Sequence, residues 1–437
     1  MDTGHSTGQR AVLVGLNLGL RDSIDIEASM QELAELTKAA GAEVLDVLIQ
    51  NKSTIEVTTF IGTGKVEEVK LAVLARDANM VIFNDELSGA QIRNLENLLE
   101  VTVIDRTALI LDIFALRAQS KIAKLQVELA QLRYRLPRLT GLNRQLSRTG
   151  GGIGTRGPGE QKLEIDRRRI QERIDEIRRQ IREAEKNRVV QRQLREKSDI
   201  PVVALVGYTN AGKSSIMNKF IEISEDGELD KQVFEKDMLF ATLDTFNRRI
   251  VFADKKEFIL TDTVGFVSKL PHSLVDAFKA TLEEALSADL LLHVVDVSDP
   301  LFEMQMTVTH QVLKELKALD KKQIILFNKI DKIEALPEVG DANAYFISAR
   351  TGEGFDQIIE TLKKDLFKDM ISACFLIPYS EGGVASYLCE NYDVESLTYE
   401  ENGTVIQTTV KIADYHKYAK YLLSERIDEE GQNEGEL

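Results

Sequence analysis

The stretch GYTNAGKS, Gly207–Ser214, directly follows the apolar run VVALV and decides the fold of its part of the chain. It satisfies the pattern GxxxxGK followed by Ser or Thr, after an expected strand and before an expected helix. In such a loop the glycines let backbone N–H groups wrap phosphates, Lys213 reaches the β and γ oxygens, and the Ser214 hydroxyl ligates Mg²⁺. The stretch therefore predicts a doubly wound α/β domain with a nucleotide site.

Three further motifs follow in order along the same part of the chain. DTVG, Asp262–Gly265, ends the apolar strand EFIL, where the aspartate can orient the Mg²⁺ shell and the Gly265 N–H can sense the γ-phosphate. NKID, Asn328–Asp331, ends the strand QIILF, and the Asp331 carboxylate can accept two N–H bonds from guanine that adenine cannot offer. Ser348-Ala349 fits a backbone contact to the guanine carbonyl. All four motifs in this order are the signature of a GTPase.

The segment LFATLDTFNRR, Leu239–Arg249, lies between the first two motifs. A threonine there should complete the Mg²⁺ shell only when the γ-phosphate is present, and Thr242 is preferred over Thr245. Phe266 follows DTVG where a Ras-type enzyme has a water-positioning glutamine, and phenylalanine can neither orient nor activate water. Unassisted hydrolysis should therefore be slow, unless Asn210 helps to hold a monovalent cation such as K⁺ beside the phosphates.

Patterning divides the chain into four expected domains. Strands and helices alternate over residues 1–112, which predicts a small α/β domain with a largely parallel sheet. Residues 113–198 are expected to form a basic antiparallel helical hairpin with an Arg/Gly-rich tip, and 199–368 the GTP-binding domain. Residues 369–437 are expected to be a small α+β domain with a helix, two strands paired about an Asn-Gly turn, a second helix and an acidic tail.

Two apolar stripes at helical spacing predict the hairpin. Pro137 is expected to end the first helix, and the second should run from about Leu163 to Lys197. Residues 117–198 carry a net charge of +12, so the remainder of a chain of net charge −16 must carry −28. Between the stripes, Arg133–Gly157 holds six arginines and no acidic residue. A block this basic in an acidic protein indicates a polyanionic partner for that block alone. The stripes consist of Ile122, Leu125, Leu129, Leu132 and Leu136, and of Leu163, Ile170, Ile174, Ile177, Ile181 and Ala184.

Length and composition exclude several classes of protein. The 437 residues are 43% hydrophobic and 29% charged, as in soluble globular proteins. No apolar run approaches the ~20 residues that span a bilayer, and the start lacks the apolar core of a secretory signal, so we expect a cytoplasmic protein with no integral membrane association. Cys374 and Cys389 stand alone, which disfavours a disulfide framework or a zinc site. Nothing demands a dimer, and a monomer is expected.

A second glycine-lysine stretch, IGTGK, occurs at Ile61–Lys65. The complete phosphate pattern is missing there, so a glycine turn at the start of a helix is the favoured interpretation. The alternative is an additional ATP-dependent RNA remodelling activity of the first domain.

Together the motifs resemble those of the HflX family of translational GTPases, through GYTNAGKSS, LFATLDT, LTDTVGFV, FNKID and SAR, preceded by GGIGTRGPGE and the arginine-rich hairpin. The resemblance implies binding to the large ribosomal subunit and to whole ribosomes, with splitting of stalled or hibernating ribosomes. It also implies that the N-terminal domain and the hairpin reach toward the peptidyl transferase centre. One departure from the family pattern is Thr245, which stands where many members have proline.

The resemblance implies a set of residues that contact GTP, with Mg²⁺ on Ser214 and Thr242 and with Lys213, Thr242 and Gly265 in catalysis. The implied nucleotide contacts are Gly207, Tyr208, Thr209, Asn210, Ala211, Gly212, Lys213, Ser214, Ser215, Phe240, Ala241, Thr242, Leu243, Asp244, Asp262, Thr263, Val264, Gly265, Asn328, Lys329, Ile330, Asp331, Ser348, Ala349 and Arg350.

Five hairpin arginines are candidates for RNA contacts, because arginine pairs with phosphate and stacks on bases, and the glycines nearby allow close approach. They are Arg135, Arg138, Arg144, Arg148 and Arg156. The alternative is a regulatory switch in which the hairpin binds a protein partner and GTP gates that contact. Stimulation of GTP turnover by ribosomes would separate the two.

Overall fold

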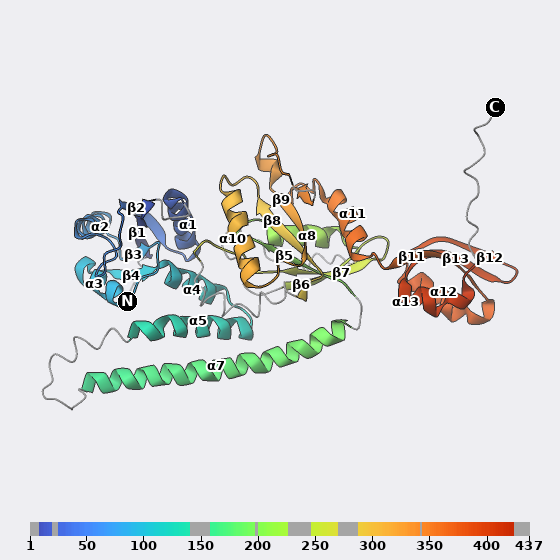
Figure 1. Ribbon diagram of the computed structural model, residues 1–437, viewed down its shortest axis with the longest axis horizontal. Helices are drawn as coiled ribbons and strands as arrows, with labels where there is room; N and C mark the ends of the chain where they lie inside the picture. The colour runs from blue at the N-terminus through green and yellow to red at the C-terminus, as the bar shows by residue number, and fades with distance from the viewer. Residues whose placement is uncertain are drawn as a thin grey trace, which may run out of the picture.

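A computed structural model gives the structure of the chain. It describes residues 8–19, 25–139, 158–196, 200–225, 246–269, 287–340 and 343–423, with the side chains of the long hairpin helix covered over 164–184. Figure 1 shows two α/β units, a smaller α+β unit at the C-terminal end, and two helices along one side of the first two units. This arrangement confirms the predicted fold class. Within the described ranges, no helix is both long and apolar enough to cross a membrane.

The N-terminal domain is a four-stranded parallel sheet of order β2-β1-β3-β4 with helices on both faces. Alternate residues of β1 face opposite sides. Val12 and Val14 pack with α2 and α3, whereas Ala11 and Leu13 pack with α1 and α4. The strand and helix alternation expected from the sequence is confirmed. The elements are β1 (Arg10–Asn17), α1 (Ile26–Ala39), β2 (Glu43–Asn51), α2 (Thr63–Arg76), β3 (Met80–Phe83), α3 (Gly89–Leu99), β4 (Thr102–Asp105) and α4 (Arg106–Arg117).

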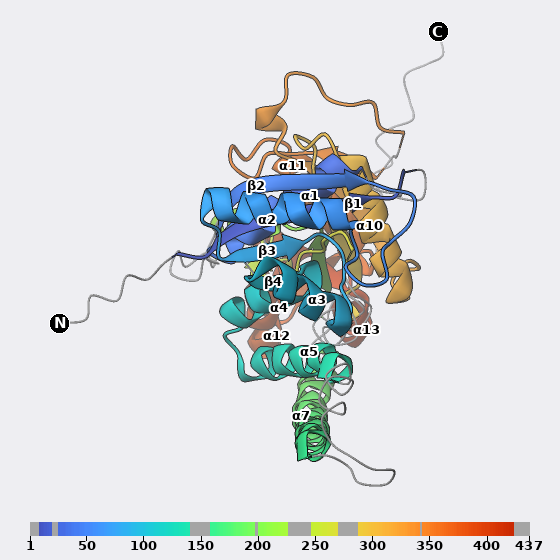
Figure 2. The same cartoon turned by 90° about the vertical axis from the view of Figure 1, so that its left-hand side faces the viewer.

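The hairpin consists of α5 (Lys121–Leu139) and α7 (Pro158–Glu196), which lie side by side in both views (Figures 1 and 2). Leu125 and Leu129 bury against Ile174, Ile177 and Ile181, as the two stripes predict. At ~1.5 Å per residue, α7 is about 58 Å long.

The expected end of the first helix at Pro137 is wrong, because α5 continues through this proline to Leu139. A proline in the last turn costs the helix only one backbone hydrogen bond. The contacts of Arg138 described below hold this last turn in place.

The third domain, expected from the sequence to bind GTP, is built on a six-stranded sheet of order β10-β9-β8-β5-β7-β6, parallel except for the β6–β7 pair. One face packs against α8 and α11. The other packs against α10 and shares a hydrophobic core with α1 and α4 of the N-terminal domain. Strand β6 was not among the strands predicted from the sequence. The elements are β5 (Val202–Gly207), α8 (Lys213–Ile223), β6 (Phe246–Val251), β7 (Glu257–Asp262), β8 (Leu290–Asp296), α10 (Phe302–Glu315), β9 (Lys322–Asn328), β10 (Ala344–Phe346) and α11 (Phe355–Leu366).

The C-terminal domain is an antiparallel sheet of order β11-β13-β12. The expected strand pair about the Asn402-Gly403 turn is present, and Gly403 has φ 152°, where its hydrogen leaves room for Ile377 O. The strand β11 was not predicted, and the second helix, expected near Tyr415 to Leu423, begins earlier and is shorter at Ile412–Lys417. The elements are β11 (Met370–Ile377), α12 (Gly382–Asn391), β12 (Val394–Glu400), β13 (Gly403–Lys411) and α13 (Ile412–Lys417).

Candidate functional site

The phosphate-loop motif connects the C-terminal end of β5 to the start of α8. Gly207 and Gly212 have φ of 149° and 95°, in the region that favours glycine. A Cβ at Gly207 would lie 2.2 Å from Val294 O, and one at Gly212 would lie 2.2 Å from Asn328 Nδ2. Both glycines are therefore required by backbone geometry and by close packing against the neighbouring strands.

Lys213 is buried in the loop and donates hydrogen bonds to the carbonyl oxygens of Gly207 at 3.2 Å and Tyr208 at 2.8 Å. Burial lowers the pKa of Lys213 to about 8. The negative charge of Asp262 acts in the opposite direction, and the positive charge of Lys329 lowers this pKa further. An ammonium held in this way gains strongly from phosphate oxygens, because they stabilise its charged form.

Ser214 and Asp262 meet at the point where a metal would be held. The Ser214 hydroxyl donates to Asp262 Oδ2 at 2.7 Å, and Asp262 is fully buried at the end of β7. Nearby, the buried Thr209 Oγ1 has no hydrogen-bond partner among the described residues. A hydroxyl and a carboxylate oxygen are ligands that Mg²⁺ prefers, so these residues fit that ion.

The base-recognition motifs meet at the same edge of the sheet. Asn328, at the end of β9, donates to Ala211 O at 2.9 Å and accepts from the Ala349 N–H at 3.0 Å. Ser348 donates from Oγ to Asp331 Oδ1 at 2.7 Å. The guanine motifs and the phosphate loop thus form one connected site, although they lie more than a hundred residues apart.

Asp296 belongs to this site and was not among the residues predicted from the sequence. It ends β8 directly beside Asn328, and its Oδ2 accepts from Lys329 Nζ at 2.6 Å. Lys329 also donates to Asn210 O at 2.8 Å. An aspartate at the carboxyl end of the neighbouring parallel strand was the available signal, since such ends gather at one edge.

Several predicted contacts fall outside the described residues. These are Phe240, Ala241, Thr242, Leu243 and Asp244, and the choice between Thr242 and Thr245 stays a prediction.

Phe266 is described, and it is buried in the core shared with the N-terminal domain. Its side chain therefore takes part in packing between domains, and a water-positioning group must come from elsewhere in the site or from a partner.

Family models match most of the chain in three consecutive parts. They are described as GTP-binding GTPase N-terminal (residues 27–115), GTP-binding GTPase Middle Region (117–195) and 50S ribosome-binding GTPase (202–329). GTPase HflX of Caldanaerobacter subterraneus subsp. tengcongensis is 47% identical over 95% of this chain and 94% of its own length. GTPase HflX of Escherichia coli is 41% identical over 95% of this chain and 97% of its own length.

The chain belongs to the HflX family of GTPases. It is a GTPase that binds GTP and GDP. A GTP-binding protein from Sulfolobus solfataricus, solved with GDP, is 22% identical with a TM-score of 0.43, and the match covers 82% of this chain and 99% of that one.

Arg138, a candidate RNA contact in this HflX-family chain, uses its guanidinium on the N-terminal domain. It donates to Leu87 O at 2.8 Å, to Glu86 at 2.9 Å and to the buried Asp105 at 3.3 Å, and it stacks over the ring of Tyr134. RNA binding by Arg138 stays a prediction, and it would require these bonds to break. Arg135 is exposed, whereas Arg144, Arg148 and Arg156 lie outside the described residues.

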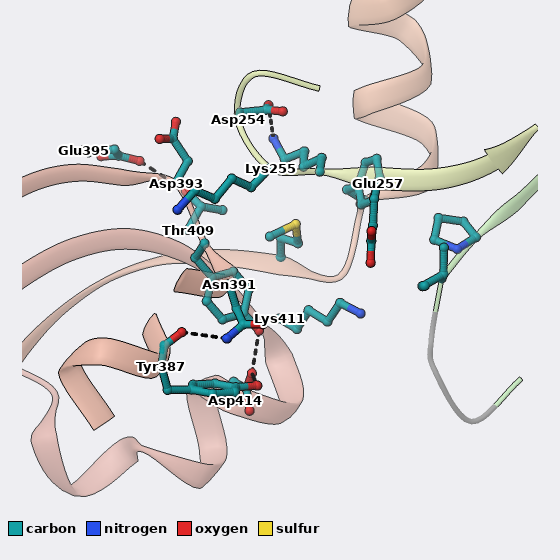
Figure 3. Close-up of a pocket in the computed structure, with 16 residues that line it drawn as sticks. Asp254, Lys255, Glu257, Tyr387, Asn391, Asp393, Glu395, Thr409, Lys411 and Asp414 are labelled. Atoms are coloured by element: carbon teal, nitrogen blue, oxygen red, sulfur yellow. Dashed lines mark hydrogen bonds and ion pairs between the residues drawn. The ribbon is translucent and has the colours of Figure 1, made fainter. Parts of the chain in front are cut away.

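A separate cavity of about 400 Å³ lies between the β6–β7 turn and the C-terminal domain (Figure 3). Positively charged lysines and negatively charged carboxylates line this cavity. The Tyr387 hydroxyl donates to Asp414 at 3.0 Å within the lining. Lys255 Nζ donates to Cys389 O at 2.5 Å and joins the two domains at its rim. Among the described residues, none of the nucleotide motifs of this HflX-family GTPase lines the cavity.

Proposed function

We propose that this protein is a Mg²⁺-dependent GTPase that binds the large ribosomal subunit and whole 70S-type ribosomes. In this proposal it dissociates stalled or hibernating ribosomes in the cytoplasm, and GTP hydrolysis recycles the factor. The observation that carries the proposal is a +12 helical hairpin attached to a GTPase domain in a chain that is otherwise acidic.

The described part of the hairpin supports a polyanionic partner. Seven exposed arginines lie along α7: Arg167, Arg168, Arg169, Arg173, Arg178, Arg179 and Arg182. Near the end of α5, a hollow of about 450 Å³ is lined by Arg135, Arg138 and Arg169, with Asp166 as its one carboxylate. Guanidinium groups pair with phosphate and stack on unpaired bases, as RNA recognition requires. The description of the matching GTPase-domain model as ribosome-binding points the same way.

The nucleotide proposal uses the geometry of the site. Ser214, together with Thr242, would hold Mg²⁺, and the ion would neutralise charge that develops on the transferred phosphoryl group. Asp331 would accept from the N–H groups of guanine, and the Gly265 N–H would contact the γ-phosphate. Asn210, whose carbonyl anchors Lys329, would help to hold K⁺; equal turnover in K⁺ and in Na⁺ would contradict this last assignment.

The test is GTP hydrolysis by the full chain with and without purified large ribosomal subunits, at one fixed salt concentration because phosphate contacts weaken steeply with salt. We expect stimulation that is lost when Arg144 and Arg148 are both changed to Glu, with GTP affinity unchanged. The control reverses two exposed lysines outside the hairpin, Lys314 and Lys317 of the GTPase domain, and should retain most of the stimulation.

Lack of any ribosomal stimulation in the natural chain would overturn the proposal. It would favour the alternative, a GTP-gated contact between the hairpin and a protein partner. Full stimulation in the Arg144/Arg148 variant would leave ribosome binding intact but remove the hairpin tip as its site.

A further inference from the structure

Four side chains from two domains form one hydrogen-bonded cluster beside the nucleotide site, which we call the interdomain clamp. Glu32 lies on α1 and Arg106 begins α4, both in the N-terminal domain. Tyr208 is the second residue of the phosphate loop, and Ser268 lies three residues after Gly265 of the DTVG motif. The clamp therefore joins the N-terminal domain to both walls of the phosphate site.

Arg106 is the centre of the clamp and is only 1% exposed. Its guanidinium donates to Ser268 Oγ at 2.8 Å, to Ser268 O at 3.2 Å and to Asn84 Oδ1 at 2.9 Å, and it forms an ion pair with Glu32. One buried cation thus holds the backbone and the side chain of the same residue in the other domain.

Glu32 completes the clamp from the opposite side. It accepts hydrogen bonds from the hydroxyls of Tyr208 and Ser268. The Ser268 N–H donates to Tyr208 Oη at 2.6 Å. Burial, followed by the charge of Glu32, raises the pKa of Tyr208, so the phenol stays protonated and remains a donor.

A buried ion pair is a poor source of stability, because desolvation opposes the attraction between its charges. Its better attested use is to fix one arrangement among several. The arrangement that the clamp fixes is the position of the segment after DTVG relative to the phosphate loop.

In the structure this segment lies directly on the phosphate loop. The Thr209 N–H donates to Phe266 O at 2.8 Å, and the Phe266 N–H donates to Gly207 O at 3.1 Å. A Cβ placed on Gly265 would come within 2.9 Å of Lys213 Nζ and 2.7 Å of Thr209 Cα.

A γ-phosphate has to fit between the lysine of the loop and the glycine of the DxxG motif, because both groups contact it. Gly265 lies against the backbone of Thr209 as well as the end of the Lys213 side chain, and two backbone hydrogen bonds tie Phe266 to the loop, so in this position the segment occupies the space that the γ-phosphate needs. GTP binding must therefore move the segment that the clamp holds, whereas GDP, which lacks the γ-phosphate, does not require this movement.

We propose that Glu32 and Arg106 are specificity-determining residues that set the preference of the site between GTP and GDP. They stabilise the segment 265–268 in the position that excludes the γ-phosphate, and their one bond to the phosphate loop is made by the Tyr208 hydroxyl, away from Ser214 and the guanine motifs. A ligand shifts such an equilibrium only by its difference in affinity for the two positions, so the clamp and the γ-phosphate oppose one another. This inference rests on the GTPase activity alone and is independent of ribosome binding.

The test measures the affinities of GDP and of a non-hydrolysable GTP analogue for the full chain, by calorimetry, in Ser268→Ala and Glu32→Gln. Losing one or two clamp bonds should raise analogue affinity about 5- to 10-fold, as expected from the net worth of such bonds. Affinity for GDP should stay within about two-fold of that of the natural chain in both variants, because GDP binds without moving the segment 265–268. The double variant should gain little beyond either single one, because both changes break the same contact.

The matched control is Asp85→Asn, which breaks the neighbouring interdomain ion pair between Lys269 and Asp85 (2.6 Å) without touching a clamp bond. It should leave the ratio of the two affinities unchanged. An unchanged ratio in Ser268→Ala would overturn the proposal, and so would an equal change in both affinities. The same shift in Asp85→Asn would assign the effect to the interface as a whole and would also overturn it. Ser268→Ala removes only one hydroxyl and keeps the test decisive if Glu32→Gln fails to fold.

Discussion

The molecule contains two glycine-lysine turns before a helix, and only one of them is a nucleotide site. At Ile61–Lys65, Gly62 has φ −65° and simply precedes α2, and Lys65 pairs with Glu68 on the same helix at 2.7 Å. At Gly207–Ser214, Lys213 is buried on loop carbonyls and is surrounded by residues of other strands.

The difference lies in the position of each turn in its sheet. The first turn comes after β2 in the chain, and β2 is an edge strand of its sheet. The second follows β5, which has β8 on one side and β7 on the other. These neighbours end in Asp296 and Asp262, so acidic groups converge on the second turn from both sides. To form a nucleotide site, a glycine-lysine turn therefore has to follow a central strand of the sheet, in addition to having the right residues.

The largest effect should separate the two lysines. Lys213→Ala should reduce GTP turnover about 10²- to 10³-fold, the scale seen when one preorganised charge-stabilising donor is removed. Lys65→Ala should leave turnover of GTP within about two-fold and should produce no change in any ATP turnover. Steady-state phosphate release from both nucleotides tests this. ATP turnover that Lys65→Ala abolishes and Lys213→Ala preserves would make the first turn a second active site.

A smaller effect should sharpen the assignment of the base-recognition end. Asp331→Asn should weaken GTP binding about 10²-fold, because two charge-assisted hydrogen bonds from guanine are lost. Affinity for xanthosine triphosphate should rise instead, since the introduced amide can donate to the carbonyl at C2 of xanthine. Competition binding with the two nucleotides measures both changes. Equal weakening for both bases would show that Asp331 acts only by holding Ser348.

The smallest effect concerns pH. Since burial lowers the pKa of Lys213 to about 8, this amine loses its proton above pH 8 unless phosphate oxygens stabilise the charge. GDP binding must then take up a proton, and the affinity for GDP should fall up to about ten-fold between about pH 8 and about pH 9. Guanosine, which lacks phosphates, is the control and should show no such loss. A flat profile for GDP would mean that Lys213 stays charged in the free protein.

Local patterns predicted most of the fold and most of the described site. The central strands are continuous apolar runs, and the loop, DTVG, NKID and Ser348-Ala349 meet where parallel strands end, as expected. The strand β11 was missed because Ile371–Cys374 mixes small and apolar residues without a clear period of two. The end of α5 was missed because tertiary contacts of Arg138 outweighed the usual effect of Pro137.

The interdomain clamp could not be predicted from the sequence. Glu32 and Ser268 are separated by 236 residues, and neither lies in a recognisable motif. Glutamate and arginine on amphipathic helices are usually solvated, and only the packing of α1 and α4 on the GTPase domain buries this pair. The local pattern around Arg106 gives no sign of its partner.

Asp105 and Arg106 are consecutive residues with different partners: Asp105 accepts from Arg138 at the end of α5, and Arg106 donates to Ser268 beside the phosphate site. In mechanical terms, a single peptide unit at the junction of β4 and α4 connects the hairpin to the segment after DTVG. A force that pulls on the hairpin reaches the phosphate site through the ion pair between Arg138 and Asp105 and the hydrogen bonds between Arg106 and Ser268. No flexible loop lies between these contacts.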